Sequence, residues 1–143
     1  MDLRKLHSWR DLPLVEVVRR LNLTDEKIMR GAEYASTTGL DALHNPDVCE
    51  ALFFFRHGGP FVIYLSDHKL IGKTARALLA ELGEPETVLR SRAGDHSAQC
   101  IYPAQGFAVS VTDDKVDFVE LFPSTTLQQY RDTLYREPAP MIA

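Results

Sequence analysis

Hydrophobic and polar positions along the chain change their period several times, and each change predicts a different element. Residues 9–23 repeat apolar side chains at helical spacing and predict a first helix. A second helix is expected from Thr24, a suitable N-cap residue followed by two acids, and should end at Gly31. Residues 32–49 carry turn signals without a clear period, so no element is predicted there.

The middle and end of the chain alternate in the manner of strands. Two aromatic and β-branched runs, 51–56 and 61–65, flank the sequence His-Gly-Gly-Pro and predict a hairpin. A helix is expected after Asp67, because the following leucines and alanines recur on one side and Gly83 can end it. The remaining pattern predicts a meander of four strands and a last helix, over residues 87–92, 98–102, 106–112, 116–122 and 123–136.

These elements together predict an α+β fold with a mostly antiparallel sheet and helices packed on one side of it. The whole chain, 1–143, is expected to form a single domain. Residues 52–65 and 108–121 align without a gap, each as two apolar runs around a polar turn. This alignment favours two tandem α/β half-repeats at 24–67 and 70–136, although any two hairpins share such a pattern.

Composition narrows the class of protein without identifying a function. The 143 residues are 45% hydrophobic and 25% charged, which is typical of a globular domain. A net charge of -4 gives no general attraction for nucleic acid or anionic lipid. No apolar run is long enough to span a bilayer, and the charged start lacks a secretory signal. We therefore expect a cytoplasmic protein with no nucleic-acid or membrane partner, in which Cys49 and Cys100 are buried free thiols.

The tripeptide Gly72-Lys73-Thr74 invites comparison with the phosphate-binding loop of nucleotide-binding proteins. That loop needs an earlier glycine, whose position is occupied here by Asp67. A carboxylate there would repel phosphate, and its Cβ would fill space that the tight loop needs. We therefore expect the tripeptide to be structural, with Gly72 allowing a turn, Thr74 capping a helix and Lys73 in solvent.

The segment LIGKTARALLAELGEPETVLR, residues 70–90, resembles the helix-to-strand segment of a known family. The family comprises the small α/β repeat domains of the outer-membrane assembly lipoprotein and the β-lactamase inhibitor protein. Its helix ends in Leu-Gly-x-Pro, matched here by 82–85, and its meander carries features matched by Tyr102-Pro103, Gly106 and 116–119. The resemblance covers residues 70–122 and implies a sheet surface that binds other proteins. The family's secretion signal and lipid-attachment cysteine are absent, so its extracytoplasmic roles are not implied.

Candidate catalytic groups are scattered rather than clustered. His96 and Cys100 lie four residues apart on a predicted strand, about 13 Å from each other and too far for one metal ion. His57 and His68 lie at opposite ends of a strand, and no serine or cysteine has the setting of a nucleophile. The sequence therefore predicts no catalytic residue, no metal and no cofactor.

The expected function is that of a non-catalytic, cytosolic protein-binding module that acts through a sheet surface. Its partner would be another protein or a second copy of the chain. The contact residues expected on the outer sheet face are Phe54, Ser110, Thr112 and Glu120. The alternative is a small-ligand-binding or hydrolytic protein with a cavity between the sheet and the helices, using His57, His68 or His96.

Overall fold

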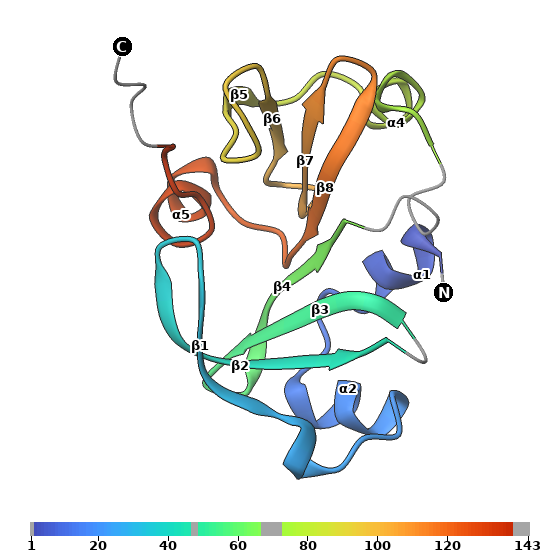
Figure 1. Cartoon of the computed structure of the whole chain (residues 1–143), viewed down its shortest axis with the longest axis vertical. Coiled ribbons are helices and arrows are strands. Elements are labelled where there is room, and N and C mark those ends of the chain that lie inside the picture. Colours follow the sequence, from blue (N-terminus) through green and yellow to red (C-terminus); the bar gives the residue numbers. More distant parts are fainter. Residues whose placement is uncertain (1, 47–48, 67–72, 139–143) are drawn as a thin grey trace.

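The computed structural model describes residues 2–46, 49–66 and 73–138 (Figure 1). Within them, eight strands form one antiparallel sheet in the order β1-β2-β3-β4-β8-β7-β6-β5. The strands are β1 (Met29–Tyr34), β2 (Thr37–Asn45), β3 (Cys49–Arg56), β4 (Gly59–Leu65), β5 (Thr87–Arg90), β6 (Ala98–Tyr102), β7 (Phe107–Thr112) and β8 (Lys115–Leu121). The helical segments are α1 (Leu3–Ser8), α2 (Leu14–Arg20), the 3-10 helix η1 (Asp25–Lys27), α4 (Ala75–Leu82) and α5 (Leu127–Thr133). The predicted α+β fold with an antiparallel sheet is confirmed.

The N-terminal third differs most from the sequence prediction. The helix expected over 9–23 is shorter, since it is α2 at Leu14–Arg20 with Pro13 in an extended conformation before it. A further short helix, α1, lies at Leu3–Ser8, where none was expected. The helix expected from Thr24 to Gly31 is only η1, after which β1 begins at Met29. So short a helix gains few internal hydrogen bonds, whereas the residues from Met29 onward pair with β2, with two register shifts. The predicted hairpin and meander are confirmed to within a few residues.

Helices α1, α2 and α4 cover one face of the sheet, which we call the inner face. Leu6, Val17 and Leu78 are the buried residues that anchor these three helices. They pack on a layer of strand side chains that includes Phe53, Phe55, Leu65, Val109, Val119 and Leu121. This layer is the main core of the protein, and it matches the expected packing of helices on one side.

The last helix departs from that expectation, because α5 packs on the opposite or outer face. It lies between the β1–β2 hairpin and the β5–β6 end of the sheet (Figure 1). Its fully buried Tyr130 contacts Phe122, and Thr37 in the β1–β2 hairpin donates a hydrogen bond to the Thr133 carbonyl at 2.7 Å. The side chains buried on this face form a second core, which we call the outer core. Phe54, which lies between two phenylalanines of the inner core, belongs to it. The sheet is therefore covered on both sides at β3.

The hairpins β3–β4 and β7–β8 have the same register and the same irregularity. Each paired residue of the first hairpin corresponds to the residue 56 positions later in the second. Phe54 pairs with Val62 just before a register shift, and the corresponding Ser110 pairs with Phe118 just before an equivalent shift. A shared bulge at one position is a far more specific similarity than two apolar runs around a turn.

The two halves of the sheet are related by a local two-fold axis. Strands β4 and β8 join them, and Tyr64 pairs there with Glu120, the residue that corresponds to it. The first residues of α2 and α4 are also held alike. The Leu14 amide donates to the Gly58 carbonyl at 3.0 Å, and the Ala75 amide to the Asp114 carbonyl at 3.2 Å. The helix that corresponds to α4 is therefore α2, which precedes the range 24–67 expected for the first half-repeat.

Candidate functional site

A fully buried carboxylate lies at the centre of the outer sheet face. Glu120, on β8, accepts hydrogen bonds from the hydroxyls of Tyr34 and Tyr130 and from the side-chain amide of Gln99 at 3.2 Å. These donors come from β1, α5 and β6 respectively, so four elements meet at one carboxylate. Each donor is itself buried, which keeps water away from the group.

Arg92, in the loop between β5 and β6, supplies the positive charge nearest to Glu120. Its Nη2 atom donates to the Tyr34 hydroxyl at 2.9 Å and lies 3.8 Å from the Glu120 carboxylate. The guanidinium stacks over Tyr34 and Phe118, with its carbon 5.1 Å and 4.5 Å from the two ring centroids. The side chain as a whole is 29% exposed, but its Nη1 atom is buried and has no hydrogen-bond partner among the described residues.

Burial dominates the ionisation of this cluster. It raises the pKa of the Glu120 carboxyl, although Arg92 and the three hydrogen bonds act in the opposite direction. Burial, together with the nearby Glu120 charge, also holds the pKa values of Tyr34 and Tyr130 well above their usual range. The two phenols therefore remain neutral hydrogen-bond donors at physiological pH.

A second set of polar side chains continues the cluster toward β5. Ser110 bonds to Ser91 and donates to Asp117 at 2.9 Å, and Thr112 donates to the same carboxylate. Asp117 occupies the position of the shared bulge, between the residues paired with Ser110 and Val111. The small polar side chains noticed in the sequence thus bind each other within the chain.

The residues expected to contact a partner are for the most part inside the protein. Phe54 is buried beneath the outer core, Ser110 and Glu120 are fully buried, and Thr112 is half-buried. The expectation of an open surface at these positions is corrected, because α5 and the β5–β6 loop cover them. Their polar atoms are used in the network described above, and Phe54 stacks on Tyr34 with ring centroids 5.0 Å apart.

The part of the outer face that remains accessible lies beside the buried network. A row of cross-strand partners leads from His44 through Leu52 to Tyr64 and then to Glu120. His44 is exposed, and Leu52 and Tyr64 are half-buried. Tyr64 lies 5.5 Å from Phe118 and 6.1 Å from Tyr34, ring to ring. We call the surface formed by His44, Leu52, Tyr64 and Arg92 the outer-face patch.

The other predicted candidates are not brought together. His57 lies in the β3–β4 turn and His96 is exposed between β5 and β6, whereas His68 and Gly72 are outside the described residues. Thr74 caps α4 as expected, accepting a hydrogen bond from the Ala77 amide at 3.2 Å, and Lys73 forms an ion pair with Glu81. In the described part of the chain, no three His, Cys, Asp or Glu side chains are grouped to hold a metal ion.

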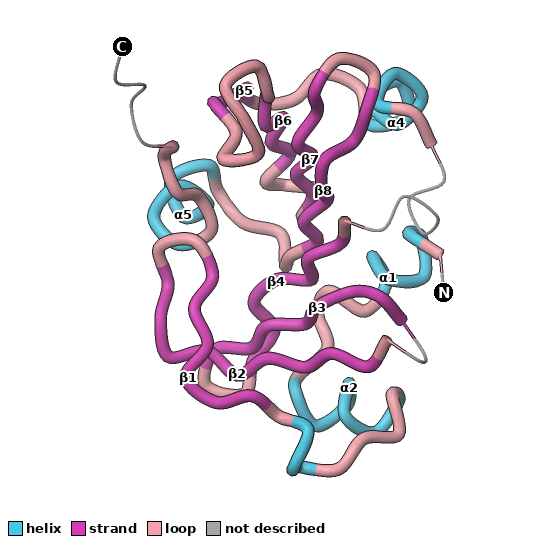
Figure 2. Tube along the Cα trace, viewed as in Figure 1, coloured by secondary structure: helices cyan, strands magenta, loops and turns pink. Residues whose placement is uncertain are grey.

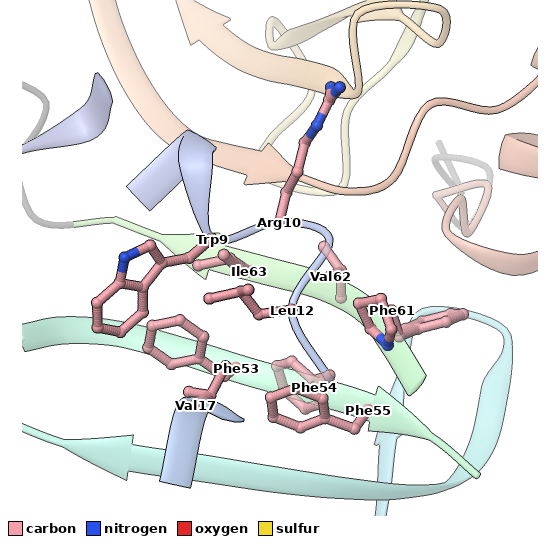
Figure 3. Close-up of a pocket in the computed structure, with 11 residues that line it drawn as sticks. Trp9, Arg10, Leu12, Val17, Phe53, Phe54, Phe55, Phe61, Val62 and Ile63 are labelled. Carbon is pink, nitrogen blue, oxygen red and sulfur yellow. The ribbon is translucent and has the colours of Figure 1, made fainter. Parts of the chain in front are cut away.

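The cavity beneath α1 and α2 is too small for a ligand. Figure 3 shows its apolar lining from Trp9, Val17, Phe53 and Ile63, while Arg10 points away toward the other half of the sheet. Its volume is about 10 Å³, which admits at most about one water molecule. The space between the sheet and helices α1 and α2 is therefore packed core.

Comparison with known proteins found no match among family models, curated proteins or solved structures. No helix among the described residues is long and apolar enough to cross a membrane. A function is therefore proposed below from the geometry of the outer face.

Sequence reasoning named Glu120 as a surface contact residue and missed its buried surroundings. Tyr34 and Tyr130 are 86 and 10 residues away from it along the chain, and Arg92 follows a strand end with no motif around it. The one usable signal was an acid in a strand otherwise flanked by Val119 and Leu121. Such an acid must have partners if both sheet faces are covered.

Proposed function

We propose that this protein is a non-catalytic protein-binding module whose contact surface is the outer-face patch. The observation that carries the proposal is the partly exposed side chain of Arg92, whose guanidinium stacks on Tyr34 and Phe118 beside the half-buried Tyr64. Arginine and tyrosine are the side chains most enriched where binding energy concentrates. An arginine that is already fixed loses little side-chain entropy when a partner binds.

The buried carboxylate supports binding better than catalysis. Glu120 is closed to solvent and its oxygens already accept three hydrogen bonds, so a substrate could reach it only by displacing Arg92 or α5. The two tyrosines are held neutral, which removes them as bases. The alternative of a ligand cavity gains no support beneath α1 and α2, where the cavity is about 10 Å³. A larger groove of about 510 Å³ lies between α4 and β6, but its lining includes none of the described histidines.

Two expectations from the sequence, a resemblance to a protein-binding family and a cytoplasmic location, are part of the same proposal. The family that residues 70–122 resemble binds proteins through sheet surfaces, and we extend that mode of action to this chain. We also propose a cytoplasmic location, in keeping with the buried free thiol of Cys100, whose pKa is raised by burial. An inert reduced thiol is typical of a reducing compartment.

Site-specific photo-crosslinking tests the proposal directly. A photoreactive phenylalanine analogue at Tyr64 should crosslink a defined protein in source-cell lysate, whereas the same analogue at Val15, exposed on α2, should not. Arg92→Lys, which keeps the charge but loses the planar stack, should lower the crosslinked yield about tenfold. Arg76→Lys on α4 is the matched control and should leave the yield unchanged.

Leu52→Glu provides a variant outside the Glu120 network. It places a charge on the patch without removing a hydrogen bond, so the protein should keep its melting temperature while losing the crosslink. Equal crosslinking from positions 15 and 64, or full yield in folded Leu52→Glu and Arg92→Lys proteins, would exclude the outer-face patch as the contact surface.

A further inference from the structure

One edge strand of the sheet pairs regularly with its neighbour, and the other does not. Strand β1 forms one edge and carries two register shifts against β2, which disturb its outer row of backbone groups. Strand β5 forms the opposite edge, and its four pairs with β6 show no shift. Figure 2 shows β5 at the end of its half of the sheet. Its side chain Val88 is 53% exposed.

The hydrogen bonds of β5 show which backbone groups face outward. The Ser91 amide donates to the Ser97 carbonyl at 3.1 Å, so residues 87, 89 and 91 direct their polar groups toward β6. The amide and carbonyl of Val88 and the amide of Arg90 therefore point away from the sheet. The Arg90 carbonyl accepts from the Tyr135 hydroxyl at 2.7 Å, and the Glu86 amide donates to the Ile101 carbonyl at 2.9 Å.

We propose that β5 is a self-association edge, on which a second copy of this chain pairs its own β5 antiparallel across a two-fold axis at Val88. In this register Val88 faces Val88 of the second copy, and Glu86 faces Arg90 in both directions. The two sheets then continue into one. This surface is separate from the outer-face patch and does not depend on it.

Charge and backbone both favour that register. Two symmetric pairs between Glu86 and Arg90 flank an apolar centre, so the segment is complementary to itself when reversed. The two Val88 residues exchange two hydrogen bonds, and each Arg90 amide meets a Glu86 carbonyl. The remaining groups of that pair, the Glu86 amide and the Arg90 carbonyl, are already bonded within each chain. The edge thus offers outward groups for this pairing at Val88 and at the Arg90 amide.

An apolar groove lies beside the edge on the same face as Val88. Val88 is the cross-strand partner of Cys100, which lines this groove of about 510 Å³ together with Leu79, Pro85 and Tyr102. A second copy placed at β5 would bring its own Val88 to the rim of the groove. Apolar area would therefore be covered in addition to the strand pairing.

The local two-fold shows what lies at the corresponding place in the first half. The Asn45 amide bonds the carbonyl of Leu21 at the end of α2, at 3.2 Å, and the Tyr102 hydroxyl bonds that of Gly83 at the end of α4, at 2.8 Å. After α2 the chain adds Leu23 and Ile28 to the inner core. After α4 it passes to β5 within four residues and adds no such pair. In the first half, Leu23 and Ile28 therefore cover the inner core next to α2. In the second half, the corresponding surface next to α4 is the apolar groove.

Charge reversal separates self-association from folding. The wild-type chain should sediment with a concentration-dependent mass that rises from 16.1 kDa toward twice that value, between about 5 and 500 µM, as small interfaces do. Glu86→Arg and Arg90→Glu should each weaken self-association at least about tenfold, because each places like charges opposite one another twice. Glu33→Arg on the other edge strand is the matched control and should dimerise like the wild type.

Mixing the two single variants gives the sharpest result. Each should be monomeric alone, yet the Glu86→Arg and Arg90→Glu chains should form a heterodimer, since every facing pair is then of opposite charge. The double variant should also regain self-association. Protection of the Val88 amide from hydrogen exchange should accompany dimer formation. Monomeric wild type at the highest concentration, failure of the mixture to pair, or a dimer with an unprotected Val88 amide would each overturn the proposal.

Discussion

Replacing Glu120 by glutamine should leave the protein at least as stable as the wild type at neutral pH. Glutamine has the shape of a protonated glutamate and can still accept from Tyr130 and Gln99 while bonding to the Tyr34 hydroxyl. It also removes the cost of burying a negative charge, which is the cause that dominates the raised pKa of Glu120. Truncation to alanine should behave differently. It leaves a void, removes the acceptor of three hydrogen bonds and leaves the Arg92 charge without its carboxylate, and it should cost about 3–5 kcal/mol.

The pH dependence follows from the direction of the pKa shift. Because the folded-state pKa lies above the ordinary value of 4.5, the folded protein binds the Glu120 proton more tightly than the unfolded chain does. The associated stability is complete below pH 4.5 and is lost as the pH rises through the folded pKa. In that window the free energy of unfolding of wild type minus that of Glu120→Gln should fall by up to about 1.4 kcal/mol per pH unit. Below pH 4.5 the two proteins should be nearly equal.

Denaturant unfolding followed by tryptophan fluorescence measures this difference. Trp9 is the sole tryptophan, is buried and lies 6.1 Å from the Phe53 ring, so its emission reports on the main core. Unfolding curves for both proteins at pH values from 4 to 8 give the difference in their unfolding free energies. The other titrating groups are the same in both proteins, so their contributions cancel in this difference. A difference that grows with pH would show that Arg92 and the hydrogen bonds outweigh burial, and the reasoning would be wrong.

Two further predictions concern positions that shape the site. Gly106→Ala should lower the unfolding free energy by more than about 3 kcal/mol, because a Cβ would meet the Phe122 carbonyl oxygen at 2.0 Å in a backbone with φ of 69°. The control is Gly31→Ala, at a similar φ but with open space around the Cβ. It should cost about 1 kcal/mol, which measures the cost of the positive φ alone. Thr126→Ala removes the side-chain cap of α5, an acceptor 3.2 Å from the Gln129 amide, and should lower the unfolding free energy by about 1 kcal/mol, whereas Ser124→Ala, exposed in the same loop, should not. Comparable losses in each variant and its control, measured by thermal or denaturant unfolding, would refute both predictions.

Sequence pattern located the second half of the fold because its signals are local. Strands β7 and β8 alternate in period two on either side of an Asp-Asp turn, and α4 is bounded by Thr74 and Gly83. Each of these features lies within a few residues of the element it defines. The first half lacked such signals at β1, where Gly31 sits inside a strand with a positive φ instead of ending a helix.

The face on which α5 packs could not be read from the sequence in the same way. Its buried Tyr130 bonds to Glu120, and its C-terminal side contacts the β1–β2 hairpin through Ser36 and Thr37. These contacts join residues almost a hundred positions apart. Periodicity reports which positions are buried and carries no information about which distant segment buries them. The residues expected at an interface were for this reason found inside the protein.

The two-fold relation between the halves accounts for both proposed surfaces. A symmetric pairing of β4 with β8 puts corresponding residues opposite each other at the axis, and here they have diverged into a half-buried Tyr64 and a buried Glu120. Tyr64 remains partly accessible in the outer-face patch. Glu120 binds Tyr34 and Tyr130 and lies beside Arg92, and so it holds in place the arginine at the border of that patch. At the far ends the halves have also diverged, into an irregular β1 and a regular, self-complementary β5. Two identical halves would present the same edge and the same face twice. The differences between the halves, at the axis and at one edge, therefore create the two distinct surfaces proposed here for binding partners.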